Sequence, residues 1–214
     1  LCYVATDAAL SAPVLEQCLH DANDNSFNAI TVDSDTSTND SVFLMASGTA
    51  ANRHITDPRD PALNDFITAL EAVMRDLAIQ IVRDGEGATK LVTIDVTGAN
   101  NKVAARQIGL AIGNSPLVKT AISGEDPNWG RIIMGIGKSG ETIDFKKLKI
   151  KLGDFIVAEN GKIADSYNEQ KLKDYMKWDS VMIEINLKLG NDAFECYTCD
   201  FTHDYIDINA DYRN

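Results

Sequence analysis

Residues 90–98 read KLVTIDVTG, and their pattern is the starting point for predicting the fold class. Apolar β-branched residues alternate in it with polar residues, which is the period of a strand that turns one face to a core. The apolar positions are Val92, Ile94 and Val96, and the polar positions are Thr93, Asp95 and Thr97. Just upstream, residues 61–81 carry the strongest helical pattern of the chain, and Gly85 marks its end. A helix that leads directly into a buried strand indicates a domain built from layers of both.

The sequence upstream of this pair also mixes the two kinds of element. Asp60 and Pro61 supply the N-cap and the first position of the helix at 61–81. The other elements expected here are a helix from Ser11 and Pro13 to residues 23–25, a strand around 28–32, and a polar loop from residue 34 that leads into a buried strand or helix at 42–46.

Strand patterns dominate the sequence further downstream. The elements expected there are a helix at 101–112, two short helices begun by Ser115-Pro116 and Asp126-Pro127, strands from Ile143 onward with turns at Gly153 and 159–161, a helix at 169–176, and a hairpin turned at 190–192. These patterns predict an α/β fold of the layered α+β kind, with helices on mixed, largely antiparallel sheets. We expect residues 1–214 to behave as one cooperative unit.

The charge balance excludes two classes of partner. The chain has 20 basic and 32 acidic residues, for a net charge of -12, which repels nucleic acid and anionic membrane surfaces. No apolar run approaches the roughly 20 residues needed to cross a bilayer. Four cysteines in 214 residues are too few for a disulfide scaffold. We therefore expect a cytoplasmic protein with reduced thiols.

The chain opens LCYVATDA, which is apolar enough for a sheet. A strand seldom begins at a bare charged terminus, and no basic residue precedes Asp7 as a secretory signal would require. We therefore expect Leu1 to be the edge of something removed or unseen.

Two motifs suggest chemistry that their context does not support. Cys196 and Cys199, with His203 nearby, have metal-like spacing, but they lie in an alternating strand, where residues three apart face opposite ways. We interpret them as structural thiols and expect no metal. The run GIGKSG at 135–140 lacks the spacing of a phosphate-binding loop and is interpreted as a helix end and turn. No Ser-His-Asp set is readable from the three histidines.

Three polar segments are candidates for a site. Residues 37–40 (STND) and 84–90 (DGEGATK) read first as a cap or turn, although glycines in the second would let a ligand approach its backbone. The tail 204–214 keeps Tyr205 and several apolar residues, which suggests that it docks and can bring its side chains into a site.

Five stretches together resemble one family, the bifunctional glutamate N-acetyltransferase or ornithine acetyltransferase of arginine biosynthesis. They are LCYVATDA, STNDSVFLMASG, EGATKLVTIDVTGA, NSPLVKTAISGEDPNWGRIIMGIGKSG and INADYRN. They run from the first residue to the last, and NSPLVKTAISGEDPNWGRI is specific enough to make chance a poor explanation. The chain is thus identified as a member of this family.

The resemblance implies a mechanism and a partner. Family members are precursors that cut themselves before a threonine, and the β chain that follows begins Thr-Met-Leu. The nucleophilic threonine would therefore lie two positions before Leu1, with no catalytic residue in the numbered chain. The implied partner is the α chain, which supplies the oxyanion hole, in an α2β2 heterotetramer with an N-terminal-nucleophile-like fold. Acetyl passes from N2-acetyl-L-ornithine to L-glutamate, some members also use acetyl-CoA, and no cofactor is implied.

The resemblance also assigns substrate contacts. Glu86 and Asn209 correspond to substrate-binding residues, and Asn214 stands where the family usually ends in threonine or serine. Lys90, Asn39 and Asp40 lie in matching motifs and read first as supports of the site. A related self-cleaving aminopeptidase or hydrolase, and a non-catalytic binding subunit of the same fold, remain as alternatives.

Overall fold

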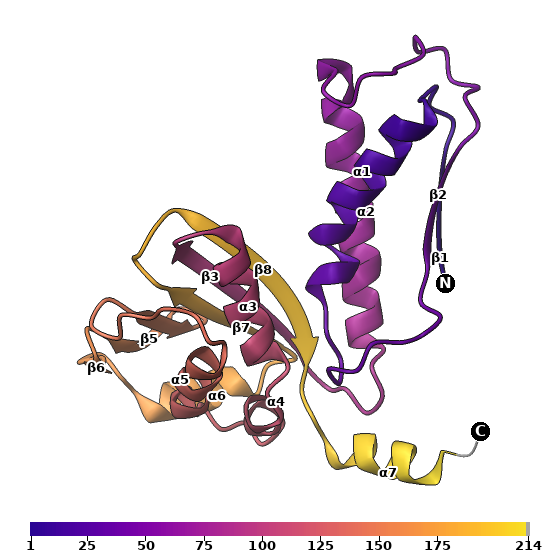
Figure 1. The fold of residues 1–214 in the computed structure, drawn as a ribbon. Helices are drawn as coiled ribbons and strands as arrows, with labels where there is room; N and C mark the ends of the chain where they lie inside the picture. The colour runs from indigo at the N-terminus through magenta and orange to yellow at the C-terminus, as the bar shows by residue number, and fades with distance from the viewer. Residues whose placement is uncertain (213–214) are drawn as a thin grey trace. The chain divides into compact units, whose positions relative to one another are not determined.

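The computed structural model describes residues 1–212. Its internal contacts divide the chain into two compact units (Figure 1). The first consists of Leu1–Asn28 with Asp35–Ala78, and the second of Ala29–Ser34 with the chain from Ile79 onward. That the chain unfolds as one cooperative unit stays a prediction.

The first unit packs two helices against a parallel pair of strands. In chain order its elements are β1 (Cys2–Thr6), α1 (Ala12–Asp24), part of the 3₁₀ helix η1 (Phe27–Ala29), β2 (Val42–Ala46), the short 3₁₀ helix η2 (Pro61–Leu63) and the first part of α2 (Asn64–Arg83). Strands β1 and β2 pair in parallel, with Cys2 opposite Val42. The core between them includes Val14, Leu70 and Met74.

Most expectations for this half of the chain are confirmed. Asp60 caps the 61–83 helical segment by accepting a hydrogen bond from the Ala62 N–H, and residues 42–46 form a strand. The strand expected around 28–32 is wrong. That segment begins as a 3₁₀ turn and makes one isolated bridge, between Ile30 and Tyr197. Its extended part is short because Ser34, at φ 78°, turns the chain away.

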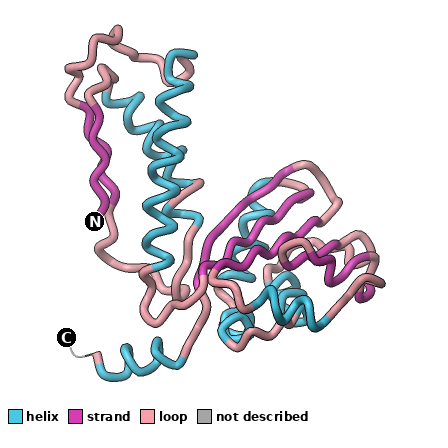
Figure 2. The backbone as a smooth tube through the Cα atoms, turned by 180° about the vertical axis from the view of Figure 1, so that it is seen from behind, coloured by secondary structure: helices cyan, strands magenta, loops and turns pink. Residues whose placement is uncertain are grey.

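The second unit is built on a mixed sheet of six strands within the described residues, visible as the larger magenta group in Figure 2. The strands are β3 (Leu91–Ala99), β4 (Lys149–Leu152), β5 (Phe155–Glu159), β6 (Lys162–Ile163), β7 (Ser180–Asn186) and β8 (Asp192–Cys199). Their order is β6-β5-β4-β7-β3-β8, and only β3 and β7 run parallel. The predicted α/β class with largely antiparallel pairing is confirmed.

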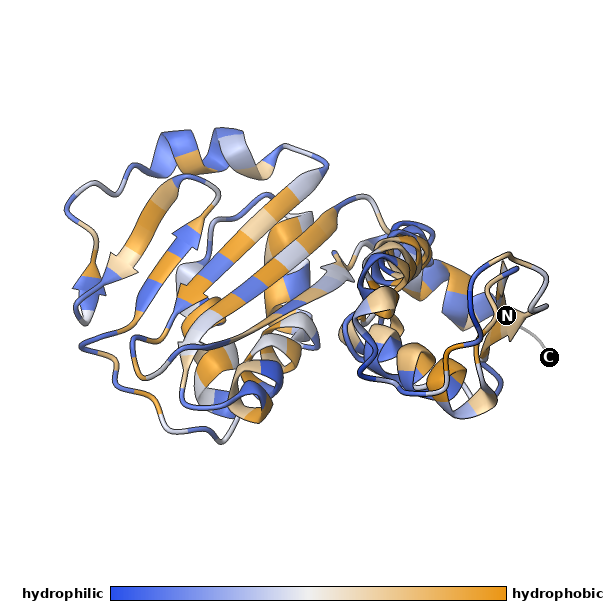
Figure 3. Ribbon diagram, turned by 90° about the horizontal axis from the view of Figure 1, so that it is seen from above, coloured by the Kyte–Doolittle hydropathy of each residue, from blue (hydrophilic) through white to orange (hydrophobic). Residues whose placement is uncertain are grey.

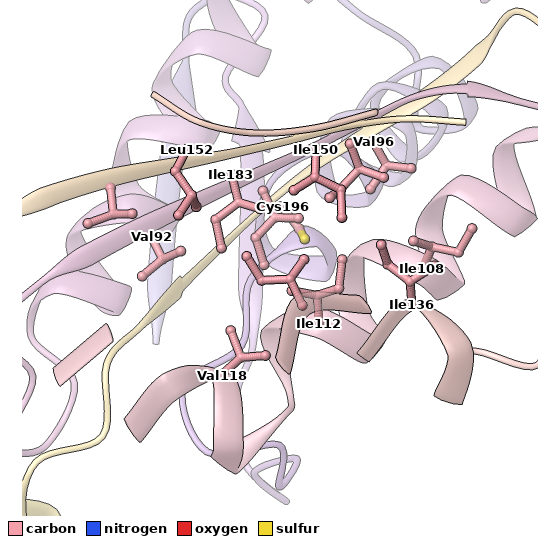
Figure 4. Close-up of a cluster of buried hydrophobic side chains, with 14 of the residues drawn as sticks. Val92, Val96, Ile108, Ile112, Val118, Ile136, Ile150, Leu152, Ile183 and Cys196 are labelled. Carbon is pink, nitrogen blue, oxygen red and sulfur yellow. The ribbon is translucent and has the colours of Figure 1, made fainter. Parts of the chain in front are cut away.

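Helices cover the apolar face of this sheet. They are α3 (Lys102–Gly113), α4 (Pro116–Ser123) and α5 (Trp129–Lys138), and the unit also contains α6 (Glu169–Met176) and α7 (His203–Asp211). Figure 4 shows Val92 and Cys196 of the sheet facing Ile112 of α3 in a closely packed core. The alternation that predicted β3 appears in Figure 3 as stripes of opposite hydropathy along the strands. Among residues 1–212, no helix has the length and hydropathy that crossing a bilayer demands.

One predicted helix start is displaced. The sequence pattern placed the cap of α5 at Asp126, before Pro127. The structure instead begins α5 at Trp129, and the Asn128 side chain accepts the N–H of Arg131. An asparagine at this position satisfies an N–H group that the first turn leaves unpaired, so the cap moves two residues downstream.

The hairpin predicted around residues 190–192 is also wrong. Strands β7 and β8 do not pair with each other, because β3 lies between them and bonds to both. Their connection crosses the end of β3, where the N–H groups of Leu189 and Gly190 both donate to the Gly98 carbonyl, at 2.8 and 2.9 Å. A Cβ atom at Gly190 would lie 2.2 Å from the Ala99 carbonyl oxygen, so only glycine fits this crossing.

We predict that Gly190→Ala lowers the free energy of unfolding by about 1–3 kcal/mol, since the added methyl group must push the connection away from β3. The matched control is Gly137→Ala in α5, where an added Cβ meets nothing within 4 Å. That control should be neutral or stabilising by up to about 1 kcal/mol, because alanine favours a helix over glycine. Urea unfolding followed by circular dichroism measures both. Equal midpoints for the two variants would contradict the crossing.

Candidate functional site

The first part of the candidate site is the loop that joins α2 to β3. Residues 84–90, called here the Glu86 loop, leave α2 through a tight turn in which the Gly85 N–H donates to the Val82 carbonyl, at 3.2 Å. Gly87 follows with φ 67°, a conformation that side chains other than glycine adopt with strain. The loop thus presents Glu86, whose side chain is exposed, between two fixed glycines.

The second part is the segment after β8. Residues 200–202 lead into α7, which follows the end of β8 (Figure 1). The Tyr205 ring stacks on Phe201 with centroids 4.7 Å apart, and its hydroxyl donates to the Asp33 carboxylate at 3.2 Å. Ile206 and Ile208 remain 63% and 43% exposed. The tail therefore docks through its first turn and through polar contacts, and its aliphatic side chains stay outside.

The structure brings Glu86 and Asn209 together. The Asn209 Nδ2 group donates to Glu86 Oε2 at 2.6 Å and to the Tyr205 carbonyl at 2.9 Å. A carboxylate can accept about four hydrogen bonds, so Glu86 keeps capacity for a cationic ligand such as an ammonium group. Asn214, the third residue assigned to substrate, lies outside the described residues.

Two further side chains fix the Glu86 loop, and neither was predicted from the sequence. Asp200 is 2% exposed, and its carboxylate accepts hydrogen bonds from the Thr89 N–H, the Thr89 hydroxyl and the Lys90 N–H, at 2.8, 2.7 and 2.9 Å. The Thr202 hydroxyl donates to the Gly87 carbonyl at 2.7 Å. No sequence spacing marks these residues, because their partners lie more than 100 positions away along the chain.

Lys90 and Asn39, two of the residues expected to support the site, make contacts within the fold. The Lys90 ammonium donates to the Trp178 carbonyl at 3.2 Å and lies 3.8 Å from a Glu125 carboxylate oxygen, with its side chain only 8% exposed. It therefore ties β3 to neighbouring segments. Asn39 and Asp40 lie in an exposed loop of the first unit, where the Asn39 N–H donates to the Ser37 hydroxyl. This geometry agrees with a local turn.

Cys196 and Cys199 are both buried and pack in different clusters. Cys196 packs in the main core, whereas Cys199 belongs to a separate cluster with Val82 and Leu91. Burial raises the pKa of Cys196 to about 12, and burial likewise raises the pKa of Cys199. Among residues 1–212, no group of three or more metal-binding side chains comes together.

The glycine run at 135–140 also agrees with its sequence interpretation. Gly135 and Gly137 lie inside α5, which ends at Lys138, and Gly140 turns the chain with φ 78°. This geometry is a helix end followed by a turn.

Comparison with known proteins identifies the family. The family profile described as "ArgJ family" matches residues 1–214. The chain belongs to the ArgJ family. Among its relatives, the arginine biosynthesis bifunctional protein ArgJ of Gluconobacter oxydans is 49% identical, and that of Ruegeria pomeroyi is 52% identical, each over all of this chain. The resemblance drawn from the sequence motifs is confirmed.

A solved ArgJ structure also shares the fold. The crystal structure of the arginine biosynthesis bifunctional protein argJ from Bacillus halodurans matches with a TM-score of 0.93 and 43% identity, covering 98% of each chain. This chain spans about half the length of the curated ArgJ relatives, 50% in Gluconobacter and 51% in Ruegeria. The solved ArgJ chain and the curated ArgJ sequences therefore differ about twofold in length.

We predict that Cys196 and Cys199 resist alkylation by iodoacetamide in the folded protein at pH 8. With a pKa of about 12, only about one Cys196 in 10⁴ is a thiolate at that pH, and burial also blocks the reagent. Mass spectrometry of tryptic peptides measures the labelling, and the same protein in urea serves as the control. Rapid labelling of Cys196 before unfolding would show that the thiol is accessible and would contradict the interpretation of the pair as structural thiols.

Proposed function

We propose that the chain is the β chain of a self-cleaved acyltransferase that moves acetyl from N2-acetyl-L-ornithine to L-glutamate. The observation that carries this proposal is the match to the ArgJ family over all of residues 1–214. The relatives are named as bifunctional proteins of arginine biosynthesis, and acetyl exchange between these two amino acids would recycle the acetyl group in such a pathway. Acetyl-CoA is proposed as a second donor.

The proposed nucleophile is a threonine that precedes Leu1 and becomes N-terminal on cleavage. A free α-amino group has a pKa of about 7.7–8.0, so near neutral pH it can accept the proton of its own hydroxyl. The hydroxyl oxygen attacks the acetyl carbonyl, the amide bond breaks, and the proton passes to the departing ornithine amine. The glutamate amine then attacks the ester, and the threonine hydroxyl regains its proton.

This chemistry needs neither histidine nor a metal or organic cofactor. Two half-reactions at one nucleophile imply ping-pong kinetics. The oxyanion that forms in each half-reaction requires hydrogen-bond donors, which commonly contribute a large share of the rate. We propose that these donors come from the α chain, so that this chain alone is inactive.

The twofold difference in length supports the proposed cleavage and partner. The curated ArgJ sequences are about twice as long as the region matched here, whereas the solved chain is matched over 98% of its length. A precursor cut into two chains of similar size accounts for both observations. We propose an αβ pair that assembles into an α2β2 heterotetramer. A cytoplasmic location is in keeping with the four cysteines, which are all free.

Glu86 and Asn209 are proposed to bind the amino-acid part of the substrates. Ornithine and glutamate derivatives carry ammonium and carboxylate groups, and a carboxylate is the natural partner of the first. The 2.6 Å contact holds Glu86 in one orientation and leaves acceptor capacity for an ammonium group. Asn214 stays a proposed contact on the family resemblance alone.

We predict that the full-length protein, mixed with acetyl-labelled N2-acetyl-L-ornithine without glutamate, acquires one acetyl ester on the first residue of its β fragment. Intact-mass and peptide analysis after rapid quenching locate the label, and the variant with the proposed threonine changed to alanine is the control. Adding glutamate should discharge the ester as N-acetylglutamate. Release of acetate instead would indicate a related hydrolase, and failure of both acylation and turnover would indicate a non-catalytic binding subunit.

We predict that Glu86→Ala lowers kcat/KM for acetyl transfer about ten- to hundredfold, as expected for losing a charge-assisted hydrogen bond to substrate. Glu86→Gln should keep the contact with Asn209 and still lose most of this activity, because the charge is gone. Glu16→Ala, which removes an exposed glutamate on α1, is the matched control and should behave as wild type. Steady-state kinetics with melting temperatures separate binding from folding. Wild-type turnover by Glu86→Ala would refute its substrate role.

A further inference from the structure

Asp200 connects the two parts of the candidate site. It is the first residue after β8, and its three hydrogen bonds all come from Thr89 and Lys90, at the end of the Glu86 loop. Oδ1 accepts both backbone N–H groups, and Oδ2 accepts the threonine hydroxyl. Hydrogen bonds to an ionised acceptor are shorter and stronger than neutral ones, so this contact is a firm one.

The loop is held at a second place by the same segment. Thr202 bonds the Gly87 carbonyl, and a Cβ atom at Gly87 would lie 2.6 Å from the Tyr205 nitrogen. The loop backbone therefore runs directly against the first turn of α7. Glu86 lies next to this fixed point, and the same helix carries Asn209, its hydrogen-bond partner.

The Asp200 carboxylate is committed to the loop and is not simply the counter-ion of a buried lysine. Lys119 is 1% exposed, and its ammonium group donates to the Thr198 hydroxyl at 2.8 Å and to the Cys199 carbonyl. Burial lowers the pKa of Lys119, while Cys199 and, more weakly, Asp200 act in the opposite direction. Asp200 thus affects Lys119 through space, whereas its own oxygen atoms bind Thr89 and Lys90.

We propose that Asp200 is a positioning residue for substrate binding. By fixing Thr89 and Lys90 to the end of β8, it keeps Glu86 at the place where Asn209 and the ammonium group of an amino-acid substrate meet it. This inference rests on the proposed substrate role of Glu86. A binding group held in place before the substrate arrives loses less freedom on binding, and a displacement of about 1 Å can cost roughly a hundredfold in rate.

The test compares two substitutions at Asp200 in the full-length, self-cleaved protein. Asp200→Ala removes all three hydrogen bonds and should raise KM for the amino-acid substrates about tenfold or more, with a smaller change in kcat. Asp200→Asn keeps an oxygen for both N–H groups, and its amide can donate to the Thr89 hydroxyl, so it should stay within about threefold of wild type. A KM for Asp200→Ala equal to wild type overturns the proposal.

A double-mutant cycle shows whether Asp200 acts through Glu86. If it does, Glu86→Ala with Asp200→Ala should be no worse than Glu86→Ala alone, whereas independent roles would give losses that multiply. Multiplicative losses overturn the positioning role. Should Asp200→Ala fail to fold, Thr89→Val removes only the hydroxyl contact and should show a smaller increase in KM, again absent when Glu86 is alanine. A KM for Thr89→Val equal to wild type then overturns the proposal.

Amide hydrogen exchange separates this proposal from the proposed function. The N–H groups of Thr89 and Lys90 should exchange faster in Asp200→Ala than in wild type, while those in the middle of β3 keep their protection. Unchanged exchange at both residues overturns the role of Asp200, whatever the activity. Wild-type activity of Glu86→Ala with faster exchange in Asp200→Ala would instead overturn the substrate role of Glu86 and, with it, the positioning role.

Discussion

The second unit depends on the double pairing of β3, which bonds in parallel to β7 on one edge and antiparallel to β8 on the other. The same strand buries Val92, Ile94 and Val96 against the helices, so its register is fixed by one face as well as by two ladders. A slip by one residue would move these side chains out of the core and polar ones into it. The fixed register of the buried middle of β3 therefore also fixes the positions of its two ends.

This register also places the candidate site. In the antiparallel ladder Leu91 lies opposite Cys199, so one position further along Lys90 faces Asp200. The hydrogen bond between the Lys90 N–H and the Asp200 carboxylate continues the ladder with a side-chain oxygen in place of a backbone carbonyl. The Glu86 loop leads into the start of β3, and the 200–202 segment follows the end of β8. Because these strands are antiparallel, both segments lie at the same end of the sheet. Their proximity is thus a consequence of the core, although both segments are outside it.

The sequence predicted the strands of this sheet better than their partners. Alternation is a local property, and it correctly predicted β3 from residues 90–98 and also the later strands β7 and β8. Pairing is not local. Gly190 between two alternating segments is a strong hairpin signal, yet the structure uses it to cross the end of β3. With β3 between β7 and β8, both sides of β3 are hydrogen-bonded, and this arrangement replaces the direct pairing of β7 with β8 that a hairpin would give. The spacing of residues in the sequence does not reveal it.

The candidate site was predictable in the same partial way. Glu86 and Asn209 came from family motifs, and their separation by 123 positions gave no reason to place them together. Nothing in the sequence marks Asp200 or Thr202, because a sequence shows which side chains can form hydrogen bonds but not what lies across from them. The cap of α5 was predicted at Asp126 and lies at Asn128 for a simpler reason, because aspartate and asparagine are nearly equal as helix caps.

Two buried charged residues, Asp200 after β8 and Lys119 on α4, illustrate the difference between stabilising a fold and positioning a loop. Asp200 and Lys119 are 2% and 1% exposed, and such groups are costly to bury unless hydrogen bonds satisfy them, as they do here. Well-packed apolar side chains often stabilise a fold as well as buried charges do. An apolar residue at position 200 could fill the same space, but it could not bind two backbone N–H groups and a hydroxyl at once. The carboxylate therefore contributes what packing cannot, a fixed direction for the loop that carries Glu86.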